Sequence, residues 1–268
     1  MRIRRSSVIV LVSAVLFVPG LAACEPGGVK TAASQSPATS TDPKQALLAS
    51  TLEIAKGNFS FAMRGDGLAG EGVVHLPSNG ARVQLTTGDA GSADSVLAMD
   101  MIYLGSDSWI KIKGAGLESV PGLGQLATGK YHHLDKTKIK GIAALDFDFQ
   151  DVDPAGAAQL TQAVVDVQKT TADTFTGNID LTKATDSRLV EQSVIENLGA
   201  QATKLPFEAK VDPQGRLVQL TVKVPAVGQT AAQDLQVTYS DYGSAAPPVA
   251  PPASEVVETP ASVYDLFK

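Results

Sequence analysis

Alternating apolar and polar residues dominate the chain between residues 58 and 113. Phe59, Phe61 and Met63 alternate with Ser60, Ala62 and Arg64, and the turn-forming run Gly65-Asp66-Gly67 follows. Three further segments, 81–86, 97–103 and 109–113, are read as strands of this kind, and the segment 73–76, which ends at the turn cluster 77–80, is read as another strand. Period two is typical of a strand with one buried face. Because the connections are too short for crossover helices, the pattern predicts a five-stranded antiparallel meander.

Three segments show helical periodicity instead. Asp42-Pro43 combines a capping side chain with a proline suited to the first helical turn. Leu48, Leu52 and Ala55 follow at helical spacing, and Gly57 ends the segment. Asp153-Pro154 repeats the start signal, with Leu160, Val164 and Val167 as the predicted apolar stripe. A third helix is predicted over about 188–197, with Gly199 as its stop.

The remaining segments predict more strands and a distinctive tail. Further strands are expected at 131–134, 174–181, 205–211, 217–224 and 235–239. Residues 114–129 are rich in Gly and Leu and predict either a short helical turn or a mobile lid. Residues 245–260 are rich in Pro and Ala, and we expect the apolar residues of 263–267 to dock back. The pattern as a whole predicts an α+β fold: an antiparallel sheet with helices packed on one side.

The first 23 residues have the parts of a secretory signal peptide. Arg2, Arg4 and Arg5 precede an apolar run from Val8 to Val18, which is too short to span a membrane. Leu21, Ala22 and Ala23 then precede Cys24, which is the single cysteine of the chain. This pattern resembles a bacterial lipobox, which implies a diacylglyceryl group on the Cys24 thiol, with acyl chains such as palmitate, and cleavage before Cys24. The alternative is a plain signal peptide with an incidental cysteine.

Composition refines this prediction. Residues 24–41 are small, polar and Pro-containing, which is typical of a flexible tether. We therefore expect a single domain over 42–268. Removing the three leader arginines changes the net charge from −6 to −9 (−6 − 3), and an acidic chain argues against nucleic acid as a partner.

The motifs of enzyme chemistry are weak. Gly65-Asp66-Gly67-Leu68-Ala69-Gly70 has the letters of a dinucleotide fingerprint, but a strand rather than a helix is predicted after it. His132 and His133, adjacent on a predicted strand, point to opposite faces and cannot readily share a metal ion. Asp146, Asp148, Asp151 and Asp153 lack the calcium-loop spacing and are read as a solvated edge with a helix cap. We predict no cofactor, no metal and no enzymatic activity.

The order of elements resembles the LppX/LprAFG lipoproteins of actinobacteria, which share a curved half-barrel sheet with the LolA/LolB carriers. The features that carry the resemblance are the lipobox at 21–24, the strand at 59–63 with Gly70-Glu71-Gly72-Val73 after it, Trp109 after the Tyr103 strand, and the runs 212–217 and 239–243. The resemblance implies an acyl-lipid ligand held between the sheet and its helices. It also implies lipid transport at the extracytoplasmic face of the cell membrane.

Apolar side chains of the predicted meander are the candidates for lining such a cavity. Methionine is deformable and common on promiscuous apolar surfaces. The candidates are Phe59, Phe61, Met63, Leu97, Met99, Met101 and Trp109. Ordinary core packing against the helices is the alternative for any one of them. The alternative function is a surface lipoprotein that docks on a membrane protein without a ligand cavity.

Overall fold

A sheet of twelve strands is the main element of the folded chain, and the helices between the strands are short. The computed structural model describes residues 42–65, 67–88, 97–119, 123–142, 145–184, 187–190, 192–227 and 231–267. The strands are β1 (Asn58–Gly65), β2 (Leu68–His75), β3 (Gly80–Thr87), β4 (Leu97–Leu104), β5 (Asp107–Gly114), β6 (Tyr131–Leu134), β7 (Val164–Lys169), β8 (Thr174–Ile179), β9 (Leu205–Val211), β10 (Leu217–Val224), β11 (Gln233–Ser240) and β12 (Val256–Glu258).

The helical elements include four α-helices: α1 (Pro43–Ser50), α2 (Lys136–Ile139), α3 (Ala157–Gln162) and α4 (Gln192–Leu198). Short 3-10 turns are η1 (Ile54–Lys56), η2 (Leu76–Ser78), η4 (Leu117–Ser119), η5 (Leu123–Gln125), η6 (Leu181–Lys183), η7 (Gly199–Thr203), η8 (Ala253–Glu255) and η9 (Ala261–Phe267).

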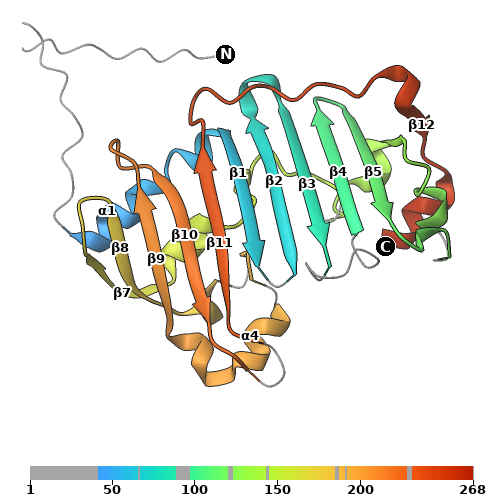
Figure 1. Cartoon of the computed structure of the whole chain (residues 1–268). Coiled ribbons are helices and arrows are strands. Elements are labelled where there is room, and N and C mark those ends of the chain that lie inside the picture. Colours follow the sequence, from blue (N-terminus) through green and yellow to red (C-terminus); the bar gives the residue numbers. More distant parts are fainter. Residues whose placement is uncertain are drawn as a thin grey trace, which may run out of the picture. The chain divides into compact units, whose positions relative to one another are not determined.

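The strands pair in the order β12-β6-β5-β4-β3-β2-β1-β11-β10-β9-β8-β7. Every neighbouring pair is antiparallel except β12 with β6, which is parallel. The predicted meander β1–β5 is therefore confirmed. Figure 1 shows β11 beside β1, where it joins the meander to the strands of the second half. The protein is thus an α+β fold with a large, open, curved and mostly antiparallel sheet.

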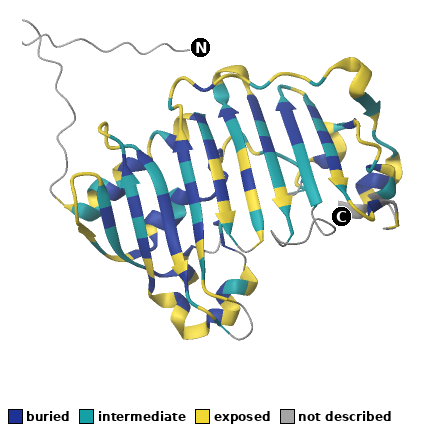
Figure 2. Cartoon of the chain, in the orientation of Figure 1, coloured by how far each residue is buried: buried dark blue, intermediate teal, exposed yellow. Residues whose placement is uncertain are grey.

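The register divides the sheet into two chemically different faces. Opposite residues of paired strands project from the same face of a sheet. One face, here called the core face, carries Phe59, Phe61, Met63, Val74, Ala81, Val83, Leu85, Leu97, Met99, Met101, Tyr103, Ile110, Ile112, Leu220, Val222, Val237 and Tyr239. The other, the outer face, carries Arg64, Arg82, Gln84, Thr86, Asp100, Lys111, Lys113, Lys223 and Asp234. Figure 2 shows buried and exposed residues alternating along the strands.

Helices and connecting segments cover the core face. In Figure 1, α1 and the chain between β6 and β7 lie behind the sheet. Leu47 of α1 and Leu160 of α3 are fully buried in the same hydrophobic core as the core-face residues. The centres of the Phe59 and Tyr239 rings lie 5.5 Å apart in an edge-to-face arrangement, a geometry that aromatic pairs favour.

Two glycines of β2 make room for large core side chains. A Cβ atom on Gly72 would lie 2.8 Å from the Phe61 ring and 2.1 Å from the Arg82 carbonyl oxygen. On Gly70 it would lie 3.0 Å from the Met63 Cε. Phe61 and Met63 therefore occupy the space that side chains on β2 would otherwise take.

The helix predictions need three corrections. The first helix ends at Ser50, where the Ser50 and Thr51 hydroxyls donate hydrogen bonds to the carbonyls of the preceding turn. Leu52, which was expected on the buried stripe, lies beyond this end and is 66% exposed. The second helix stops at Gln162, and Val164 and Val167 belong to β7. Their β-branched side chains favour a strand, and β8 supplies its hydrogen-bonding partner. The third helix, α4, runs over 192–198 rather than 188–197.

The Pro-rich C-terminal segment runs along the ends of β1–β5 and then returns to the sheet (Figure 1). Its start is held by a hydrogen bond of 3.1 Å from the Ala245 amide to Asn58 Oδ1. Its end pairs with β6 as β12, and Val263 and Tyr264 are buried. The prediction that the last apolar residues dock back is confirmed. Within 114–129, the described residues form the 3-10 turns η4 and η5, as the short-turn alternative predicted.

Candidate functional site

Six of the seven predicted cavity residues share one face of the sheet. Phe59, Phe61 and Met63 of β1 and Leu97, Met99 and Met101 of β4 all project from the core face. Trp109 of β5 pairs with Ile102 and His133 and projects from the outer face. The centres of the Trp109 and His133 rings lie 5.7 Å apart. A ligand between sheet and helices would therefore meet the first six side chains and not Trp109.

The six core-face candidates differ in how far the protein itself covers them. Four are fully packed: Phe59, Phe61, Met63 and Met101 are between 0% and 9% exposed. Leu97 and Met99 are only partly buried, as is Leu85, which pairs with Met99 across β3 and β4. The accessible apolar surface of the core face thus includes this end of β3 and β4. The position of accessible residues along a strand could not be read from alternation alone.

The acidic cluster of 146–153 serves the fold. Asp153 is 7% exposed, and its carboxyl oxygens accept hydrogen bonds from the amides of Ala155, Gly156 and Ala158 at 3.1–3.2 Å. It also accepts a bond of 2.7 Å from the Tyr239 hydroxyl. Burial, with the negative charge of Asp153 nearby, raises the pKa of Tyr239 well above its usual value. Asp153 therefore ties the segment before α3 to β11 as a structural anchor.

The two adjacent histidines point to opposite faces, as predicted. His132 is buried on the core face, and its Nε2 lies 2.9 Å from Thr128 Oγ1. Burial lowers the pKa of His132. His133 lies on the outer face, where its Nε2 is 3.0 Å from Asp107 Oδ1 and its Nδ1 is 3.4 Å from Glu258 Oε1. Within the described ranges, no group of three or more His, Cys, Asp or Glu side chains could hold a metal ion.

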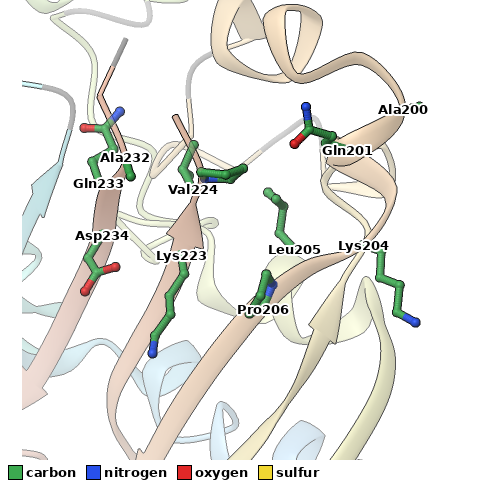
Figure 3. Close-up of a pocket in the computed structure, with 11 residues that line it drawn as sticks. Ala200, Gln201, Lys204, Leu205, Pro206, Lys223, Val224, Ala232, Gln233 and Asp234 are labelled. Carbon is green, nitrogen blue, oxygen red and sulfur yellow. The ribbon is translucent and has the colours of Figure 1, made fainter. Parts of the chain in front are cut away.

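A surface pocket with a volume of about 710 Å³ lies at one end of β9, β10 and β11 beside η7. Pairing between β9 and β10 stops at Phe207 and Val222, so the two strands separate beyond that point. Figure 3 shows Leu205 and Val224 within this pocket, with Gln201 of η7 and Lys204 around it. Leu205 and Val224 are buried, whereas most of the other lining residues are exposed.

The second pocket has a volume of about 190 Å³ and lies on the outer face of β3, β4 and β5. A polar network borders it: Arg82 donates to both carboxyl oxygens of Asp100, and Tyr131 donates to Asp100 at 2.7 Å. Burial, followed by this hydrogen bond, raises the pKa of Tyr131 to about 12. Sequence reasoning missed this network. Its one signal was the row of polar residues at alternate positions of 82–86, with Asp100 as an isolated charge in the apolar strand 97–103.

The predicted lipidation site cannot be placed in the fold. Leu21, Ala22, Ala23, Cys24 and the tether 24–41 lie outside the described residues. Among the residues that are described, no helix combines the length and apolar character needed to cross a membrane.

Comparison with models of known protein families and with curated proteins finds no match to this chain.

Proposed function

We propose that the chain is a membrane-anchored lipoprotein of the extracytoplasmic face that binds an acyl lipid between its sheet and its helices. In this proposal, Cys24 carries the lipid anchor and the domain has the half-barrel form of the LppX/LprAFG and LolA/LolB proteins. The domain then works as a lipid carrier in the cell envelope, without enzymatic activity. The leader and the single cysteine at its end support the anchor.

One observation carries the ligand part of the proposal: the apolar core face extends beyond the side chains that the protein covers fully. Leu85, Leu97 and Met99 lie next to one another across β3 and β4 and remain partly accessible. They adjoin buried Met101 and Ile112, so an acyl chain lying on them would extend an existing hydrophobic core. Each CH₂ group buried in this way contributes about 0.8 kcal/mol.

Binding of a fluorescent fatty acid to the full chain, freed of bound lipid and detergent, tests this site. We expect Met99→Glu to weaken binding at least about tenfold, because an acyl chain would have to desolvate the carboxylate. Ala62→Glu is the matched control, because Ala62 is exposed on the outer face of β1. Equal binding by both variants, with their thermal unfolding unchanged, would refute an acyl site on the core face.

A second candidate function rests on how well the remaining core face is packed. Phe61 and Met63 fill the space above Gly72 and Gly70, and the two pockets described above lie outside the layer between sheet and helices. These facts favour a lipoprotein that docks on a membrane protein without a ligand cavity. It predicts no uptake of the fatty-acid probe, and capture of a membrane protein that Met99→Glu leaves intact.

A further inference from the structure

The pocket on the outer face arises from the sizes of neighbouring side chains. Ala98 of β4 lies between Thr86 of β3 and Lys113 of β5 in one cross-strand row. The next row contains Gln84, Asp100 and Lys111. Because Ala98 is the smallest of these residues, the longer side chains around it enclose a hollow of about 190 Å³.

The one carboxylate of the hollow already has its partners. Arg82 donates to Asp100 from Nε at 2.9 Å and from a terminal nitrogen at 2.7 Å. Tyr131 donates at 2.7 Å and Gln84 at 3.5 Å. A bidentate arginine matches the carboxylate in both charge and geometry. Asp100 therefore leaves little negative charge for a cation, and the two lysines determine the charge that a ligand meets.

The lysines supply positive charge that the protein neutralises only in part. Lys111 and Lys113 are two positions apart on β5, so both project from the outer face, with Cα atoms about 7 Å apart. The side chain of Lys111 is 16% exposed; its Nζ lies 4.7 Å from the centre of the Tyr131 ring and 3.3 Å from Glu255 Oε2. Lys113 is exposed and has no ion pair within the described part of the chain.

The Glu255 carboxylate of the protein itself neutralises part of the positive charge of Lys111. It belongs to η8 of the C-terminal segment and is 51% exposed. Its carboxylate meets Lys111 from a segment 144 residues further along the chain. Glu71 carries the other nearby negative charge, but it lies on β2 opposite Gln84, on the far side of the hollow from the lysines.

From this arrangement we propose that the hollow binds one small anionic group, a phosphate or a carboxylate, between Lys111 and Lys113. The Thr86 hydroxyl supplies a further donor at its edge. A volume of about 190 Å³ is below the roughly 300–1,000 Å³ of sites for whole drug-sized ligands, so the hollow fits a single charged group. A locally positive hollow on a chain of net charge −6 concentrates anions there. The proposal does not depend on acyl-lipid binding, because the hollow lies on the opposite face of the sheet.

Calorimetric titration of the full chain in a neutral detergent, at low ionic strength, tests the site. One arm uses inorganic phosphate, and a second uses short-chain phosphatidylglycerol with phosphatidylcholine as its zwitterionic counterpart. We expect Lys113→Ala to weaken binding about tenfold, the effect of losing one hydrogen bond to a charged group. Glu255→Gln should strengthen binding several-fold because it removes the competing carboxylate. Lys223→Ala, an exposed lysine of the outer face on β10, is the matched control and should bind as the unchanged chain does.

The two arms separate the sources of the anionic group. Phosphate binding that Lys113→Ala weakens and Lys223→Ala does not supports a site for a free anion. Binding confined to phosphatidylglycerol, with the same response to the two variants, supports a lipid headgroup. If neither ligand binds, or if Lys113→Ala and Lys223→Ala behave alike, the proposal is overturned.

Discussion

Replacing Tyr239 by Phe removes one oxygen atom from the core and tests whether Asp153 is a structural anchor. Tyr239 is 3% exposed, and its ring contacts with Phe59 and Tyr242 would remain in the variant. What disappears is the hydrogen bond of 2.7 Å to the Asp153 carboxylate. Hydrogen bonds to charged groups contribute about 1.5–3 kcal/mol, so we expect the free energy of unfolding to fall by about that amount.

Urea unfolding, followed by circular dichroism, measures this loss directly. Tyr242→Phe is the matched control, since its hydroxyl donates at 2.6 Å to a neutral acceptor, the Leu217 carbonyl. We expect the control to lose only about 0.5–1.5 kcal/mol. For a domain of this size the main variant should also melt at a temperature lower by roughly 3–12 °C. If Tyr239→Phe lowered the free energy of unfolding no more than Tyr242→Phe, the role of Asp153 as a structural anchor would be refuted. In that case, stabilisation of the unchanged chain by added Ca²⁺ would indicate that the acidic cluster is a metal site.

Three further predictions concern packing, pH and the anchor. Gly72→Ala should destabilise the fold by about 1–3 kcal/mol in urea unfolding, because the new Cβ would lie 2.1 Å from a backbone carbonyl oxygen of β3. Gly70→Ala should lower the free energy of unfolding by less, because the nearest contacts of its new Cβ are the ends of flexible side chains. His132 has a lowered folded-state pKa, so the unfolded state binds the proton more readily, and stability should decline as pH falls below about 6.5. The free energy of unfolding, measured from pH 8 to 5, should fall less in His132→Gln than in the unchanged chain, and should fall as before in His75→Gln. If it fell as before in both variants, titratable groups other than His132 would cause the decline. Cys24→Ser should leave the domain folded and move it from the membrane fraction into the medium, and its retention in membranes by fractionation would contradict the lipid anchor.

The strands could be predicted from the sequence because their chemistry is local. Phe59, Phe61 and Met63 alternate with polar neighbours, and the structure places β1 there with these three residues in the core. Val164 and Val167 misled the helix prediction, because their spacing suits a helix while their branched side chains and the partner strand β8 favour a strand. A pairing partner cannot be read from one segment.

The pairing of strands that are far apart in the chain could not be predicted from the sequence for the same reason. The pairing of β1 with β11 joins residues about 180 positions apart, and no local pattern indicates it. The size and apolar character of Trp109 suggest a place among the core-face residues, but register alone decides its face. The Asp100 network was missed because its members come from β3, β4 and β6, which approach each other only in the folded sheet.

Native mass spectrometry of the full chain, produced in its own host and released gently from the membrane, tests acyl-lipid binding most directly. We expect a chain that begins at Cys24, carries covalently bound acyl groups and holds an additional lipid that dissociates on collisional activation. A chain carrying the anchor but no dissociable lipid, across several preparations, would contradict acyl-lipid binding.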